Sequence, residues 1–163
     1  MWRIGLIAAA VVVAIDQLSK WWVVDVIMRP PRVIELTPFL NLVMGWNRGV
    51  SFGLFNTAAP WAPWVFSGLA SAIVVFMWIW LMRTELKLVA AAIGLIIGGA
   101  VGNIIDRLRY GAVADFIDVH AAGYHWPAFN AADSAITVGA VLLVADSLLR
   151  PAEGRKNMDG QAN

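Results

Sequence analysis

Four long apolar runs constrain the fold of this chain more than any other feature of its sequence. Each run has about the 20 residues that a helix needs to cross the hydrocarbon core of a bilayer. Hydrophobic residues make up 60% of the chain and charged residues 14%, whereas soluble domains have about 45–50% and roughly 25%. We therefore predict a membrane α-helical fold with four transmembrane helices, at about residues 4–27, 61–82, 86–105 and 129–149.

The first run could instead be a cleaved signal peptide, because Arg3 precedes its apolar start. Hydrophobicity resumes at Trp21, however, and no small-x-small cleavage site follows the run, so a retained span is favoured. Tryptophans also gather near the ends of the apolar runs, where their rings can be half buried at the lipid headgroups. They are Trp2, Trp21, Trp22, Trp61, Trp64, Trp78 and Trp80.

Two longer segments separate the runs, and an even number of spans puts both on one side of the membrane. The first excursion, residues 28–60, contains four prolines and strand-like runs at 33–36, 39–46 and 50–55. This pattern predicts a small β-rich sheet or half-barrel on the membrane surface, between spans one and two. The second excursion, residues 107–128, follows span three. We treat residues 1–163 as a single integral membrane domain.

The orientation follows from the basic residues that flank the spans, since short cytoplasmic segments are enriched in Lys and Arg. The side with both termini has Arg3, Arg83, Lys87, Arg150, Arg155 and Lys156, six in all, against five on the other side. The bias is small, but the short turn at 83–87 and the polar tail at 150–163 are both basic. We therefore predict cytoplasmic termini and extracytoplasmic excursions.

Composition also limits which kinds of catalytic, metal or binding site the chain can contain. The chain has no cysteine, which removes disulfides, thiolate metal sites and a cysteine nucleophile. Its net charge of +1 gives no argument for nucleic-acid binding. A metal site would have to use His120 and His125 with Asp118, and their spacing fits no standard zinc pattern. We expect neither a metal nor another cofactor.

Ionisable side chains inside apolar runs are costly and point to function. In "DQLSK", Asp16 and Lys20 lie four residues apart, so they share a helix face and can form a structural ion pair. Ser19 and Lys20 could instead be a hydrolytic Ser/Lys dyad. Adjacent helical residues point about 100° apart, however, which disfavours a direct bond between them.

The second and third polar motifs border the outer ends of spans two and three. In "NRGVSFG", Asn47 and Gly49 could bind an anionic or peptide group, or simply form a turn between strands. In "GLIIGGAVGNIIDRLRYG", glycines recur every four residues and predict a flat face for close helix packing. The glycine-rich span three could pack closely against span four and so draw the acids of the two segments together. Asn103, Asp106 and Arg107 follow it directly, which predicts a polar network at the membrane surface.

Three acids belong to the second excursion and the start of the last run: Asp115, Asp118 and Asp133. Asn130 and Asp133 have the spacing of a helix-capping box, so Asp133 could be no more than part of a cap. Asp115 and Asp133 come from different segments on the same side, however, and can meet. Two close carboxyl groups share a proton, so one can activate water while the other hydrogen-bonds a scissile carbonyl.

The motifs together resemble one family. "DQLSK", "NRGVSFG", "GGAVGNIIDR", "VADFIDVH" and "FNAADS" occur in the order and at the separations of the bacterial lipoprotein signal peptidases, or signal peptidase II. The resemblance implies an aspartic endopeptidase of the bacterial plasma membrane. Its members remove the signal peptide from prolipoproteins, cutting just before a Cys that carries diacylglycerol.

The resemblance also implies roles for individual residues. Asp115 and Asp133 match the catalytic aspartates, and Asp118 falls outside the match and is left as structural. Supporting or substrate-binding positions match Asn103, Asp106, Arg107, Asn130, Asn47 and Gly49, while Asp16 and Lys20 match the first motif. The expected partners are the lipid-modified substrate and membrane lipids, with the protein acting as a monomer.

Two other functions fit the residues less well. Asp16, Lys20, Asp106 and Asp133 could line the polar path of a small transporter or channel. Such proteins usually show internal repeats or interrupted helices, and the sequence has neither. A non-catalytic membrane scaffold, with the acids as helix caps, is the third possibility.

Overall fold

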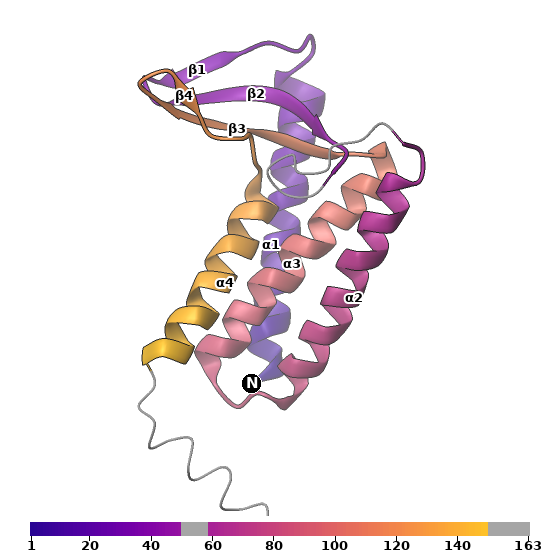
Figure 1. The fold of residues 1–163 in the computed structure, drawn as a ribbon, viewed down its shortest axis with the longest axis vertical. Helices are drawn as coiled ribbons and strands as arrows, with labels where there is room; N and C mark the ends of the chain where they lie inside the picture. The colour runs from indigo at the N-terminus through magenta and orange to yellow at the C-terminus, as the bar shows by residue number, and fades with distance from the viewer. Residues whose placement is uncertain (50–58, 150–163) are drawn as a thin grey trace, which may run out of the picture.

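The computed structural model describes residues 1–49 and 59–149. Four long helices form a bundle, and a small antiparallel sheet covers one end of it (Figure 1). The helices are α1 (Trp2–Trp21), continued by the π-helical segment η1 (Trp22–Ile27), α2 (Ala62–Arg83), α3 (Lys87–Tyr110) and α4 (Ala131–Leu149). The strands are β1 (Ile34–Thr37), β2 (Leu40–Asn47), β3 (Val113–Ala121) and β4 (Tyr124–His125).

The four helices confirm the predicted spans, and each is long and apolar enough to cross a membrane. The central helix is α3, because 67% of its most apolar stretch is buried, against 11–22% for the other three. The outer helices instead expose many large apolar side chains, such as Ile7, Phe76 and Val141. Surfaces of this kind require lipid as their solvent, so the chain is a multi-pass membrane protein.

The end of α3 differs from the prediction. The sequence suggested that span three ends at Ile105, where charged residues begin, but the helix continues to Tyr110. Asp106 and Arg107 are 0% and 8% exposed, so their side chains enter the protein interior rather than the lipid. The helix ends at Gly111, whose φ of 70° is the left-handed conformation common after a helix C-terminus.

The face of α3 that carries Gly94, Gly98 and Gly102 packs against α1. Side-chain atoms added at Gly94, Gly98 and Gly102 would collide with Gly5, Ala9 and Asp16 of α1, respectively. The sequence locates this flat face but does not say which helix covers it, and the predicted close packing of span three on span four is confirmed at other glycines.

Different glycines bring α3 and α4 together. A Cβ at Gly99 would collide with the Ala132 backbone, and a Cβ at Gly139 of α4 would collide with the Ala92 backbone. The central helix therefore has two close contacts on different faces, one with α1 and one with α4.

The sheet combines both excursions. Its strand order is β1-β2-β3-β4, with every pair antiparallel. The predicted strands at 33–36 and 39–46 correspond to β1 and β2, and the third, at 50–55, lies outside the described residues, as does the predicted tail at 150–163. β3 and β4 come from the second excursion, where no strand was predicted. In the β2–β3 register, Gly45 pairs with Asp115 and Asn47 with Val113, which brings the second motif beside the first predicted catalytic acid.

Candidate active site

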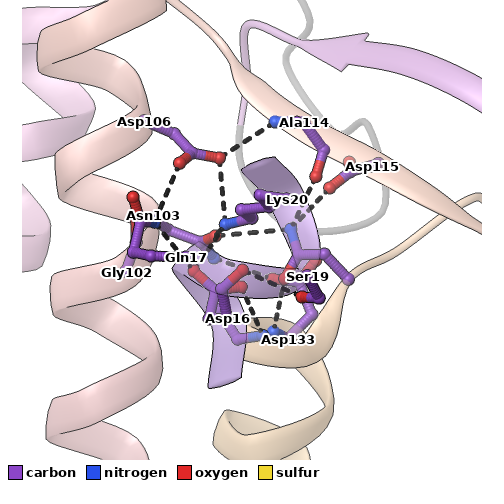
Figure 2. Close-up of polar contacts among 12 residues, drawn as sticks. Asp16, Gln17, Ser19, Lys20, Gly102, Asn103, Asp106, Ala114, Asp115 and Asp133 are labelled. Carbon is purple, nitrogen blue, oxygen red and sulfur yellow. Dashed lines mark hydrogen bonds and ion pairs between the residues drawn. The ribbon is translucent and has the colours of Figure 1, made fainter. Parts of the chain in front are cut away.

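Buried polar side chains gather where α1, α3, the start of α4 and strand β3 meet (Figure 2). All nine come from the motifs in the sequence. They are Asp16, Lys20, Asn47, Asn103, Asp106, Arg107, Asp115, Asn130 and Asp133, each no more than 8% exposed. A cluster of this size must satisfy its own hydrogen bonds, because neither lipid nor bulk water is available to it.

Asn130 caps the helix that carries Asp133. The backbone N–H of Asp133 donates to Oδ1 of Asn130 over 2.9 Å, which is the usual N-cap bond to the third helical residue. The Asp133 side chain is turned toward α3, where Nδ2 of Asn103 donates to its Oδ1 over 2.9 Å. Asn130 therefore supplies the cap, and the carboxylate of Asp133 faces the polar cluster.

Asp115 receives a hydrogen bond on each oxygen. Nδ2 of Asn130 donates to Oδ1 over 2.7 Å, and Nδ2 of Asn47 donates to Oδ2 over 3.0 Å. Burial, and then the negative charge of Asp133, raise the pKa of Asp115 to about 7, against an ordinary value of 3.8. The two amide donors and Lys20 oppose this rise and lower the pKa of Asp115 in part.

Asp115 and Asp133, from separate segments of the chain, thus form a pair in which the charge of Asp133 raises the pKa of Asp115. Asn130 contacts both, because it accepts from the Asp133 backbone and donates to the Asp115 carboxyl. One carboxyl can hold a proton at neutral pH while the other is ionised, which is the arrangement that general acid–base catalysis needs.

Known proteins are similar to this chain in sequence. The family model described as signal peptidase (SPase) II matches residues 8–149. The chain belongs to the signal peptidase II family. A lipoprotein signal peptidase of Methylorubrum extorquens (strain PA1) is 44% identical over 99% of this chain and 94% of that protein. The lipoprotein signal peptidase of Burkholderia thailandensis (strain E264) is 46% identical over 86% and 84%.

Solved structures share the fold. Two structures described as bacterial membrane enzymes superpose with TM-scores of 0.77 and 0.76, at 31% and 30% identity. The first alignment covers 88% of this chain and 87% of that one, and the second covers 90% and 94%. This member of the signal peptidase II family is therefore a membrane peptidase with signal peptidase function, and the transporter alternative is not supported.

Arg107 lies on the side of the site nearest the second motif. Its guanidinium donates to the carbonyl oxygens of Gly49 over 2.8 Å and Asn103 over 3.3 Å. Its Nε is buried and has no hydrogen-bond partner within residues 1–49 and 59–149. A buried guanidinium with a spare donor can bind a carbonyl group of a peptide.

Asp118 lies apart from the pair, near the other end of β3. Nδ1 of His125 contacts its carboxylate at 2.9 Å, and Nδ2 of Asn41 donates to it over 3.0 Å. Burial alone would raise the pKa of Asp118, but the hydrogen bonds from His125 and Asn41 outweigh it and lower the value. The His120 ring stacks on His125, with centroids 4.7 Å apart.

The residues of the first motif form the part of the site that lies on helix α1. Lys20 Nζ lies 2.8 Å from Asp16 and 2.9 Å from Asp106, so Asp16 and Lys20 are in contact and a second acid joins them. The Ser19 hydroxyl donates to the Asp16 carbonyl oxygen over 2.9 Å. Sequence reasoning missed Gln17, whose Nε2 donates to both acids over 3.1 Å. The available signal was a side-chain amide within an apolar run.

Proposed function

We propose that this protein is an aspartic endopeptidase that removes the signal peptide from diacylglyceryl-modified prolipoproteins, with Asp115 and Asp133 as the catalytic residues. The observation that carries the proposal is a pair of buried carboxyl groups from β3 and α4: Asn130 donates to the carboxyl of Asp115 and accepts the backbone N–H of Asp133. The chain has no cysteine that could act as a nucleophile. The Ser19 hydroxyl donates to a backbone carbonyl oxygen, so it is not placed as a nucleophile either.

The mechanism assigns one role to each acid. Because its pKa is raised to about 7, Asp115 can hold a proton near neutral pH, and we assign the role of general base to Asp133. Asp133 takes a proton from a water molecule, whose oxygen attacks the carbonyl carbon of the scissile peptide bond. Asp115 hydrogen-bonds the carbonyl oxygen and stabilises the negative charge that develops on it. Collapse of the tetrahedral intermediate returns the proton to the leaving amine and frees the signal peptide.

Substrate binding uses groups that surround the pair. Arg107 has a buried Nε with no partner in the described residues, and we assign it to a carbonyl group of the substrate. Asn47 and Gly49, from the second motif, contact Asp115 and Arg107, respectively, and place this segment beside the scissile bond. The relatives are named lipoprotein signal peptidases, which supports a lipoprotein precursor as substrate.

The site is placed for a substrate that is itself in the membrane. A signal helix with an attached lipid diffuses only in the plane of the bilayer. The polar cluster lies between the bundle and the sheet, at one end of the helices (Figures 1 and 2), where the end of such a helix would arrive. The closely packed α1, α3 and α4 hold the acids at this depth.

The proposed location is the bacterial plasma membrane, with both termini in the cytoplasm and the active site near the extracytoplasmic face. The N-terminus and the last turn of α4 lie at the end of the bundle opposite the sheet (Figure 1). Arg3, Arg83 and Lys87 lie at that same end, which favours it as the cytoplasmic side. We propose that the protein acts as a monomer.

The decisive experiment is a cleavage assay with purified protein in detergent. The substrate is a prolipoprotein carrying diacylglycerol on its Cys, and the control is the same precursor without lipid. We expect a single cut immediately before the lipidated Cys and little cleavage of the unmodified precursor. A folded protein that cuts neither, or cuts elsewhere, would contradict the proposal.

A further inference from the structure

Lys20 has more contacts than an ion pair within α1 requires. Its ammonium lies 2.8 Å from Oδ2 of Asp16, 2.9 Å from Oδ2 of Asp106 and 3.1 Å from Oδ1 of Asn103. The side chain is 3% exposed. An ammonium group has three donors, so these contacts use all of them, and two of the three acceptors belong to α3.

Each carboxylate bound by Lys20 also holds the backbone next to one catalytic acid. Oδ1 of Asp16 accepts from the N–H of Ala132 over 3.0 Å, and Ala132 directly precedes Asp133. Oδ2 of Asp106 accepts from the N–H of Ala114 over 3.1 Å, and Ala114 directly precedes Asp115. One buried charge therefore joins the start of α4 to strand β3.

The third contact of Lys20 fixes the orientation of an amide. Lysine can only donate, so Oδ1 of Asn103 must face Lys20, and Nδ2 of Asn103 must face away from it. That Nδ2 donates to Oδ1 of Asp133 over 2.9 Å. Nδ2 of Asn130 also donates to Oδ1 of Asn103, over 3.4 Å, so loss of Lys20 removes the shorter of two bonds that hold the amide. A rotated amide would present an oxygen to the Asp133 carboxylate, which would repel it.

We propose that Lys20 is a positioning residue for the Asp115–Asp133 pair, acting through Asp16, Asp106 and Asn103. This inference rests on the proposed aspartic mechanism and goes beyond a structural ion pair. Lys20 does not contact the reacting groups in this arrangement. It determines the positions of Asp115 and Asp133, and it determines that the Asn103 amide presents its Nδ2 hydrogen to Asp133. Figure 2 shows Lys20 between α3 and the segment that carries Asp115.

The charge of Lys20 also acts directly on the pair. Burial and Asp133 raise the pKa of Asp115, whereas Lys20 lowers it, and Arg107 is a further cation that interacts with both acids. Loss of the ammonium charge should therefore move the pH profile of cleavage to higher pH. A residue that only stabilised the fold would change the melting temperature and leave that profile in place.

Gln17 offers a matched control. It donates to Asp16 and Asp106 over 3.1 Å each and to the Gly102 carbonyl over 3.2 Å, so it joins the same two acids from the same helix. It carries no charge, and none of these bonds goes to Asn103. Gln17→Leu thus weakens the buried network without removing either effect that is assigned to Lys20.

The experiment compares kcat, KM, pH profile and melting temperature for Lys20→Met, Lys20→Arg and Gln17→Leu, with lipid-modified prolipoprotein as substrate. For Lys20→Met we expect kcat to fall roughly a hundredfold, as displacement of reacting groups by an ångström can do. KM should change little, and the profile should move to higher pH. Lys20→Arg, which keeps the charge, should restore the profile and part of kcat. Gln17→Leu should lose thermal stability but keep the wild-type profile.

A Lys20→Met variant with the kcat and pH profile of Gln17→Leu would overturn the inference. Asp115→Asn and Asp133→Asn are assayed in parallel, because activity in both would refute the aspartic mechanism itself, whereas their inactivity leaves the test of Lys20 intact.

If Lys20→Met does not fold, Lys20→Met/Asp106→Asn removes one buried negative charge and keeps an acceptor for Ala114. This double variant should be slower than Asp106→Asn alone, with its profile at higher pH; equal rates and profiles would refute the role of Lys20.

Discussion

Asn130, the residue directly before helix α4, donates from Nδ2 to Oδ1 of Asp115 on strand β3 over 2.7 Å. The same side chain accepts the backbone N–H of Asp133 through Oδ1. Because a backbone N–H can only donate, the cap fixes which end of the Asn130 amide faces Asp115. Helix capping and the orientation of the acid pair therefore depend on one residue.

Asn130→Ser separates these two tasks. Serine is as good an N-cap as asparagine, so the free energy of unfolding should change by about 1 kcal/mol or less. The shorter hydroxyl cannot reach Asp115 as the amide does, so cleavage should fall strongly. Asn130→Ala, which loses both functions, should be less stable and equally slow. Initial cleavage rates and melting temperatures check this, and a Ser variant with normal activity would contradict it.

Replacement of either acid of the pair should abolish cleavage in a folded protein. Asp133→Asn and Asp115→Asn keep the side-chain shape but cannot exchange a proton with water or with each other. The double variant should be scarcely worse than either single one, as expected of residues that act together. Asp118→Asn, on the same strand as Asp115, is the control and should retain activity. The measurement is the initial rate on lipid-modified prolipoprotein; substantial turnover by folded Asp133→Asn would leave this acid as no more than part of the helix start.

The raised pKa of Asp115 predicts a pH-dependent stability. Its pKa is about 7 in the folded protein and 3.8 for the ordinary carboxyl, so between these values the folded state binds the extra proton and stability falls as pH rises. The stabilising contribution is fully present below pH 3.8 and lost above about 7. Asp115→Asn should thus gain stability relative to wild type across this window, by at most about 4 kcal/mol. Melting temperatures at several pH values test this; a constant difference would show that Asp115 is not perturbed.

Close packing of α1 on α3 should not tolerate a methyl group. Gly94→Ala places its Cβ against the backbone of Gly5, which cannot move as a side chain could. Overpacking of this kind costs about 1–3 kcal/mol. Gly68→Ala is the matched control, because no atom lies within 4 Å of its added Cβ. The Gly94 variant should melt at a lower temperature and the Gly68 variant should not; equal melting temperatures would refute the tight α1–α3 contact.

The membrane orientation can be tested with single cysteines, since the chain has none of its own. Tyr124 is exposed in the sheet, and Glu85 is exposed in the turn at the opposite end of the bundle. Tyr124→Cys should react with an impermeant thiol reagent added outside intact cells, and Glu85→Cys should react only after the membrane is opened. The reverse pattern would place the site in the cytoplasm.

The sequence by itself determined the features that depend on neighbouring residues along the chain. The four spans follow from local hydropathy, the contact of Asp16 with Lys20 follows from the four-residue helical repeat, and the Asn130 cap follows from its spacing to Asp133. The ordered motifs also indicated the family that the comparisons show. Such features need no knowledge of which segments meet in space.

Only the tertiary structure decided which distant segments meet. The Gly94, Gly98 and Gly102 face of α3 packs on α1, β3 joins a sheet expected from the first excursion alone, and α3 continues past Ile105. In each case, a residue pattern identifies a surface that must be buried, and several partners satisfy it equally well. The contacts of Lys20 with Asp106 and Asn103 on α3 are of the same kind. They exist because close helix packing at Gly94, Gly98 and Gly102 brings α1 within hydrogen-bond reach of α3, and that geometry arises from the packed bundle as a whole.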